Sequence, residues 1–232
     1  MNSDSTHVTT ISFSGIDGAG KSTQIRALEE WLQQAGLRVQ LLTFWDNIVA
    51  FSRMREFVSH RAFKGDKGVG SPEKPLERRD KNVTSWPVTA MRFFFYCADA
   101  ASLSWKVRNL KKRGADVVIF DRYIYDELAN LPLNRPATRF FVRLVLKLVP
   151  QPDLALVLDA DPIAARARKP EYPLEFLLRN RAAYLTLSRV AGNITVIEPQ
   201  TVNGASMKIR QAYLKQIPAS SQAGFSGLPA LQ

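Results

Sequence analysis

A glycine-rich turn between a strand-like run and a helix-like run constrains the fold of this chain most strongly. Residues 8–14 are rich in β-branched side chains, which is typical of a buried strand. The turn that follows, over residues 15–23, reads GIDGAGKST. Beyond it, apolar residues recur at helical spacing over residues 25–35, and Gly36 stands where a helix would end. This order predicts the first unit of a parallel α/β sheet.

The turn also matches the P-loop (Walker A) spacing, from Gly15 through Gly20 to Lys21 and Ser22. Glycines let backbone N–H groups approach a polyphosphate closely, and the N-terminus of the next helix attracts negative charge. Lys21 supplies a positive charge for the β- and γ-phosphates, and Ser22 offers a hydroxyl to Mg²⁺. The alternative is a chance glycine-rich turn. The residues assigned to nucleotide phosphate binding are Gly15, Ile16, Asp17, Gly18, Ala19, Gly20, Lys21, Ser22 and Thr23.

The remaining patterns predict one three-layer α/β domain of the P-loop NTPase type over residues 1–216. About five parallel strands carry helices on both faces. The later strands are expected over residues 39–44, 117–120, 154–158 and 194–197, and further helices over 48–61, 85–113, 138–149 and 174–191. Residues 64–82, rich in Gly, Pro and charge, predict a mobile insertion, and residues 217–232 predict a flexible tail.

Two charged residues, Asp121 and Arg122, end the apolar run over residues 117–120. The carboxyl ends of parallel strands face the ligand crevice, which places both side chains near the P-loop. There Asp121 would hold a metal-bound water, and Arg122 would face a transferred or accepting phosphate. The alternative is an Asp-Arg pair that only caps a turn.

A short basic segment, RARKPEYP over residues 166–173, follows the strand expected over residues 154–158. Phosphoryl transfer needs positive charge around three equatorial oxygens, and arginine supplies it bidentately. The segment therefore predicts a closing lid over about residues 166–174, with Arg166 and Arg168 as catalytic arginines. The alternative is a solvated basic loop.

These stretches together resemble the thymidylate kinase family of P-loop nucleoside monophosphate kinases. The matching stretches are GIDGAGKST (15–23), FFFYCADA (93–100), VVIFDRY (117–123), PDLALVLDADP (152–162) and RNRAAYLTL (179–187). The resemblance implies transfer of the γ-phosphoryl group of ATP, with Mg²⁺, to a nucleoside monophosphate, with thymidylate as the default acceptor. It also implies a homodimer.

By the same resemblance, Asp17 would lie near the acceptor sugar and Tyr96 would stack on the acceptor base. Arg122 would hold the acceptor phosphate and Asp121 would serve the metal. Arg166 and Arg168 would lie in the lid.

Three departures from the family leave the acceptor open. Residues 44–47 read FWDN where the family carries an Arg-Glu-Pro-Gly-Gly-type turn, and Ala100 stands where an arginine reads the thymine edge. The third departure is the insertion over residues 64–82. The acceptor of such a kinase would then be another nucleotide, a nucleoside or a phosphorylated sugar. Among the arginines, Arg53, Arg55 and Arg92 are candidates to replace the missing phosphate contact.

The formal net charge of +11 predicts an anionic partner. Residues 51–116 carry 15 basic and 7 acidic side chains, whereas residues 1–50 carry 3 and 5. The excess of basic residues thus lies in the part of the chain where the acceptor is expected to bind, which favours nucleotide substrates. The weaker alternative is a non-catalytic protein that binds nucleotides or nucleic acid. Cys97 is the only cysteine, no apolar run reaches membrane-spanning length, and no signal peptide is recognised. We therefore expect a cytoplasmic protein without a membrane partner.

Overall fold

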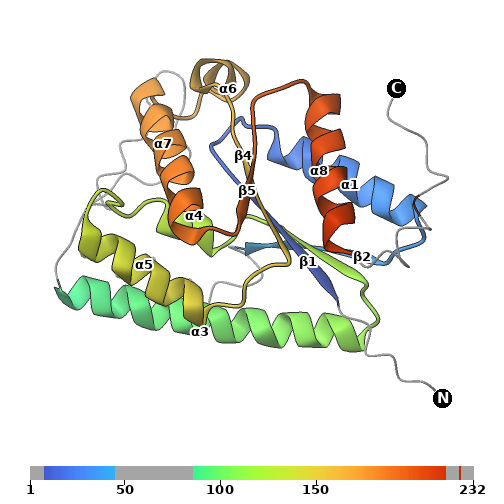
Figure 1. The fold of residues 1–232 in the computed structure, drawn as a ribbon, viewed down its shortest axis with the longest axis horizontal. Coiled ribbons are helices and arrows are strands. Elements are labelled where there is room, and N and C mark those ends of the chain that lie inside the picture. Colours follow the sequence, from blue (N-terminus) through green and yellow to red (C-terminus); the bar gives the residue numbers. More distant parts are fainter. Residues whose placement is uncertain (1–7, 45–85, 218–224, 226–232) are drawn as a thin grey trace.

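The computed structural model describes residues 8–44, 86–217 and 225, and its centre is one parallel sheet. The strands lie in the order β2-β3-β1-β4-β5, and all of their pairings are parallel (Figure 1). Their bounds are β1 (Thr9–Ser14), β2 (Val39–Thr43), β3 (Val117–Asp121), β4 (Leu154–Leu158) and β5 (Ile194–Ile197). The predicted five-stranded parallel sheet is confirmed, because each predicted strand forms within a residue of its expected bounds.

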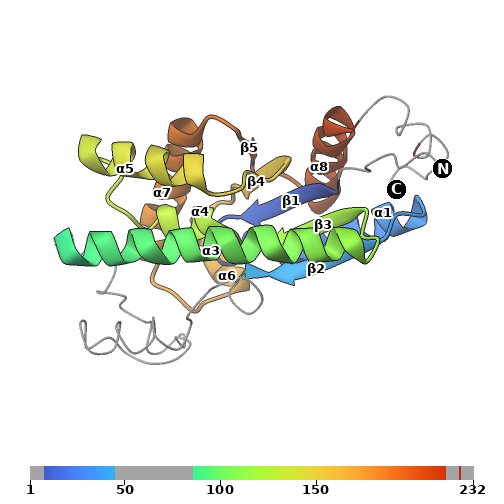
Figure 2. The same ribbon diagram turned by 90° about the horizontal axis from the view of Figure 1, so that it is seen from below.

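Alternation along the strands divides the apolar side chains between the two faces of the sheet. On one face, Ile11 and Phe13 of β1 pack with α1 (Lys21–Gln34) and α8 (Val202–Gln216). On the opposite face, Val118 and Phe120 of β3 pack with α3 (Trp86–Lys112), α5 (Pro136–Leu148) and α7 (Leu174–Ala191). Figures 1 and 2 show these two helical layers on either side of the sheet. The predicted three-layer architecture is thereby confirmed.

Three helices were not expected from the sequence. Two of them, α4 (Ile124–Leu128) and α6 (Pro162–Arg168), are shorter than two turns, so their apolar residues cannot display a helical period. The third, α8, buries a narrow stripe that includes Ile209 and Tyr213 between polar residues. Its N-terminus does carry a recognisable signal, since the Thr201 hydroxyl accepts a hydrogen bond from the N–H of Gly204.

Phe225, from the predicted tail, packs on the layer formed by α1 and α8. Its ring centroid lies 4.6 Å from that of Trp31 and 5.8 Å from that of Tyr213. The rest of the tail after residue 217 lies outside the described residues, as do the helix expected over residues 48–61 and the insertion over residues 64–82. Among the described helices, none has both the length and the apolar character needed to cross a bilayer.

Candidate active site

Three loops with functional side chains meet at the carboxyl edge of the sheet. The P-loop follows β1, Arg122 follows β3 and Asp159 follows β4. Since β1 lies between β3 and β4 and all three run in parallel, these loops are neighbours. The parallel topology thus assembles residues that are more than 100 positions apart in the chain.

The P-loop needs glycine where it passes close to other backbone. Gly15 and Gly18 have φ values of 137° and 80°, which side-chain-bearing residues rarely adopt. A Cβ on Gly15 would lie 2.5 Å from the carbonyl oxygen of Leu158, and one on Gly18 would lie 2.2 Å from that of Ala165. The loop is therefore in contact with the end of β4 and with α6.

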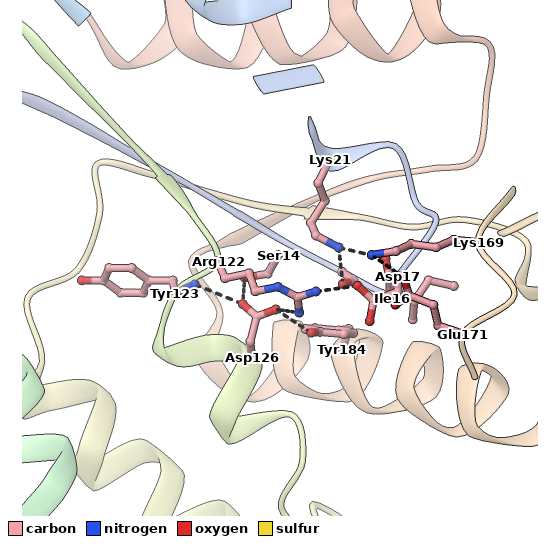
Figure 3. A network of polar contacts seen from close by, with 11 residues as sticks. Ser14, Ile16, Asp17, Lys21, Arg122, Tyr123, Asp126, Lys169, Glu171 and Tyr184 are labelled. Carbon is pink, nitrogen blue, oxygen red and sulfur yellow. Dashed lines mark hydrogen bonds and ion pairs between the residues drawn. The ribbon is translucent and has the colours of Figure 1, made fainter. Parts of the chain in front are cut away.

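Lys21, the first residue of α1, is only 8% exposed, and its amine lies inside the P-loop. The Nζ atom donates hydrogen bonds to the carbonyl oxygens of Gly15 at 2.8 Å and Ile16 at 2.9 Å (Figure 3). Burial, and then the nearby Arg122, lower the pKa of Lys21 to about 8, although the carboxylates of Asp17, Asp126 and Asp121 oppose this shift. The amine is thus a desolvated cation at the centre of the site.

Arg122 adopts a backbone conformation that is rare for its residue type. Its φ of 69° makes it the one non-glycine residue in the left-handed region within the described part of the chain. Its N–H donates to the carbonyl oxygen of Phe13 at 3.0 Å. Its guanidinium lies between two carboxylates, at 2.5 Å from Asp17 and 3.4 Å from Asp126.

These contacts favour the charged forms of both Arg122 and Asp17. Although burial opposes the charge of Arg122, Asp126 and Asp17 raise the pKa of its guanidinium above the ordinary value. Burial by itself would raise the pKa of Asp17, but Arg122 and Lys21 hold it below the ordinary range. The site therefore holds two cations and at least one ionised carboxylate.

Asp126, which was not predicted from the sequence as a site residue, is a buried carboxylate on α4. It accepts hydrogen bonds from the hydroxyls of Ser14 at 2.6 Å and Tyr184 at 2.7 Å, and from the N–H of Tyr123 at 3.1 Å (Figure 3). Burial, and then Asp126, raise the pKa of Tyr184 well above its ordinary value, so its hydroxyl remains a donor. The signal that was available was the acidic pair Asp126–Glu127 between apolar residues in the stretch IYDEL.

The predicted metal ligands occupy accessible positions. Ser22 and the neighbouring Thr23 are exposed on the first turn of α1, and Asp121 is half-exposed at the end of β3. Among the described residues, no donor hydrogen-bonds to the Asp121 carboxylate, and no cluster of three or more His, Cys, Asp or Glu side chains is suited to a metal. Ser22 and Asp121 are thus suited to an ion that arrives with other ligands, rather than to a site made by protein alone.

The two predicted lid arginines lie on different faces of α6. The Nε of Arg168 donates to the carbonyl oxygen of Gly18 at 3.0 Å, whereas Arg166 lines a hollow with Ile163 and Leu174. The two arginines are two positions apart in the chain, which is about half a helical turn. The structure therefore brings Arg168 to the P-loop and turns Arg166 away from it.

A second arginine holds α7 to the end of β4. The guanidinium of Arg181 binds Asp159 through two hydrogen bonds, of 2.6 Å and 2.7 Å. Neither residue was predicted from the sequence to have a role. This pair connects the helix after the predicted lid to the same edge of the sheet.

Tyr96 does not lie at an accessible surface. It is 3% exposed on α3, and its ring centroid lies 6.4 Å from that of Phe141 on α5. The structure thus covers the ring that was predicted to stack on the acceptor base. Ala100, one turn further along α3, is also buried. Phe44, the first residue of the FWDN stretch that departs from the family, is buried against Tyr123. Residues 45–47 lie outside the described part of the chain, and so do Arg53, Arg55 and the side chain of Arg92.

Solved structures with similar folds include two thymidylate kinases. That from Candida albicans aligns with a TM-score of 0.58 at 18% identity, covering 90% of this chain and 92% of that chain. That from Ehrlichia chaffeensis aligns with a TM-score of 0.56 at 18% identity, covering 90% and 99%. These likenesses confirm the P-loop α/β fold.

Sequence comparison gives a closer relationship. The chain is 30% identical over 202 residues to the thymidylate kinase of Leifsonia xyli subsp. xyli, covering 81% of this chain and 85% of that protein. It is 27% identical over 190 residues to a probable thymidylate kinase of Methanosphaera stadtmanae, covering 79% and 86%. No model of a protein family matches the chain. The extent and identity of these matches, together with the fold and the P-loop, place the chain in the thymidylate kinase family.

Proposed function

We propose that this protein transfers the γ-phosphoryl group of ATP to thymidine monophosphate, giving thymidine diphosphate and ADP. The observation that carries the proposal is the pair of cations at one edge of the sheet, Lys21 in the P-loop and Arg122 beside Asp17. Two phosphorylated substrates that meet end to end need one such cation each. Membership of the thymidylate kinase family supports the choice of substrates.

Each charged group has a defined task in this reaction. The backbone of residues 15–20 wraps the phosphates of ATP, and Lys21 neutralises the charge on the transferred group. Arg122 holds the phosphate of the acceptor and Asp17 accepts a hydrogen bond from its sugar. Arg168, already bound to Gly18, supplies lid charge above the donor phosphates.

Ser22 and Asp121 would hold Mg²⁺ in this proposal. One hydroxyl and one carboxylate suit an ion that keeps several waters and takes its other ligands from phosphate. Such an ion would neutralise negative charge on the phosphates during transfer. Asp121 is proposed to orient a water of that ion rather than to react itself.

A panel of acceptors in a coupled ADP-release assay tests the function. We expect thymidine monophosphate to give the highest kcat/KM, above other nucleoside monophosphates, thymidine and phosphorylated sugars. The alternative that the sequence left open is a kinase of a different acceptor, because Ala100 stands where the family carries its base-reading arginine. A higher kcat/KM for another acceptor would establish that alternative. ADP release at the background rate with every acceptor would instead indicate a non-catalytic binding protein.

We further propose that the enzyme acts in the cytoplasm as a homodimer, as its family membership suggests. Light scattering of the purified protein tests the dimer, and a monomeric mass at assay concentration would contradict it.

Replacing Gly18 with alanine should separate α6 from the P-loop. The new Cβ would meet the Ala165 carbonyl oxygen at 2.2 Å, and a backbone atom cannot move aside as a side chain can. We expect ATP affinity to fall at least about tenfold, measured by titration calorimetry, because the loop must shift to accommodate the methyl group.

Gly36→Ala is the matched control, because Gly36 has nearly the same φ, 81°, and has no atom within 4 Å of a new Cβ. It should lose about 1 kcal/mol of stability from backbone strain and retain its ATP affinity. Equal ATP affinities in the two variants would contradict the contact between α6 and the loop.

ATP binding should become weaker above pH 8. The pKa of Lys21 is lowered to about 8, and bound phosphates favour the charged amine, so above this pH binding must take up a proton. We expect the association constant to fall about tenfold between about pH 7 and about pH 9. Calorimetry in buffers of different ionisation heat checks the proton uptake. A Lys21→Met variant should bind weakly and lack this pH dependence, whereas an unchanged slope in that variant would assign the proton to another group.

A further inference from the structure

The proposed reaction leaves one buried charged group of the site without a role. Asp126 is 4% exposed, and both of its carboxylate oxygens are engaged (Figure 3). Oδ2 accepts from the Ser14 hydroxyl and from the N–H of Tyr123, while Oδ1 accepts from the Tyr184 hydroxyl and faces Arg122 at 3.4 Å. The neutral donors come from β1, from the turn after β3 and from α7, so three separate parts of the chain fix this carboxylate.

The residue that Asp126 faces is held in an unfavourable conformation. A non-glycine residue at φ 69° is strained by roughly 1 kcal/mol or more, and it persists only where its surroundings hold it. For Arg122, these surroundings are its N–H bond to Phe13 and the two carboxylates that flank its guanidinium. Loss of a flanking carboxylate would let the side chain turn away from its present direction.

The carboxylates of Asp17 and Asp126 differ in whether they stay bound to Arg122 when the acceptor binds. The Asp17 side chain is 17% exposed, against 4% for Asp126, and in the proposed function it turns to the sugar when the phosphate reaches Arg122. Asp126 is buried on the opposite side of the guanidinium and is fixed by three other donors. It therefore remains beside Arg122 throughout the reaction.

We propose that Asp126 is a positioning residue, which holds Arg122 in its left-handed turn and directs its guanidinium at the acceptor phosphate. Ser14 and Tyr184 act one step further away by fixing the carboxylate. This inference rests on the proposed function in one respect, the assignment of the acceptor phosphate to Arg122. Because Asp126 acts through Arg122, its loss should weaken binding of the acceptor and leave binding of ATP unchanged.

Kinetics of Asp126→Asn test this inference. We expect KM for the acceptor to rise about tenfold and KM for ATP to change less than about twofold. In an Arg122→Ala background the same substitution should have no further effect on the acceptor, since the group that Asp126 positions is gone. Equal losses in the two backgrounds, or equal changes in both KM values, would overturn the proposal.

Asp153→Asn is the matched control for a general loss of stability on neutralising a hydrogen-bonded carboxylate. The Asp153 carboxylate also accepts from a hydroxyl and a backbone N–H, both from Thr10 at 2.7 Å, but it lies at the amino edge of the sheet. We expect it to lower the melting temperature while both KM values stay unchanged. Should Asp126→Asn fail to fold, Tyr184→Phe keeps the charge and removes one donor, and about a threefold rise in acceptor KM is expected. No rise would overturn the proposal.

The wild-type acceptor panel separates this inference from the proposed function. If another acceptor is preferred, the same cycle is measured with it. If no acceptor is turned over, crystal structures of the wild type and Asp126→Asn decide. Arg122 should leave the left-handed region in the variant, and an unchanged Arg122 would overturn the inference whatever the enzyme's substrate.

Discussion

Replacing Lys21 with alanine lowers kcat for phosphoryl transfer by an expected factor of about 10³, while the protein remains folded. The amine lies inside the P-loop, bonded to the carbonyl oxygens of Gly15 and Ile16. After burial, Arg122 is the cation that lowers the pKa of Lys21, and it is engaged by Asp17 and Asp126, so it is not free to take the place of the amine. Single-turnover measurements with saturating ATP and acceptor check the effect on the chemical step.

The same substitution should not lower stability at neutral pH. Burial lowers the pKa of Lys21 from 10.5 to about 8, so below pH 8 the folded protein carries a cation that is destabilised by about 3 kcal/mol. The unfolded chain binds the extra proton between about pH 8 and 10, and wild-type stability therefore rises with pH in that window. Urea unfolding of wild type and variant at both ends of the window checks this, since the rise should be absent from the variant.

Lys147→Ala, an exposed substitution on α5, controls for loss of a lysine elsewhere. It should leave kcat and the pH dependence of stability unchanged. Full turnover by Lys21→Ala would exclude the catalytic role of the P-loop amine.

Replacing Arg122 with alanine should lower kcat/KM for the acceptor by about 10²- to 10³-fold and change KM for ATP little. It should also lower stability by about 3 kcal/mol, because it leaves Asp17 and Asp126 with no guanidinium between them. Steady-state kinetics with each substrate varied in turn check the first effect, and urea unfolding checks the second.

The variant Arg122→Gly separates the effect of losing the guanidinium charge from the effect of backbone strain at residue 122. Glycine adopts φ 69° without strain, so this variant should be more stable than Arg122→Ala by about 1 kcal/mol with the same kinetics. Arg143→Ala, exposed on α5, should match the wild type. An ATP-side defect in Arg122→Ala equal to the acceptor-side defect would contradict its assignment to the acceptor phosphate.

The sequence predicted the parts of the site that depend on local spacing. The P-loop and the Asp121–Arg122 pair each follow an apolar strand, and parallel topology brings the ends of such strands together. Asp126 was not predicted because its partners Ser14 and Tyr184 are 112 and 58 positions away in the chain. Pairing over such distances depends on how α4 and α7 pack, which local periodicity does not record.

Tyr96 and the lid arginines illustrate a second limit of periodicity. Apolar residues surround much of α3, so its pattern does not identify the face that packs on α5, and the contact between Tyr96 and Phe141 was not predicted. The sequence predicts one role for both lid arginines, because the helix α6 that carries them is too short to recognise from its periodicity. Once α6 is present, Arg166 and Arg168 must diverge.

The ion pair between Asp17 and Arg122 also has a consequence for selectivity. In the absence of substrate, the guanidinium already has an anionic partner from within the protein, so any incoming anion competes with an internal one. Inorganic phosphate would displace Asp17 from Arg122 and bring no sugar hydroxyl to take over that contact. A nucleoside monophosphate would displace it and offer a sugar hydroxyl in exchange. The protein would thereby reject free phosphate, which is abundant in cells, through competition rather than through the shape of a pocket.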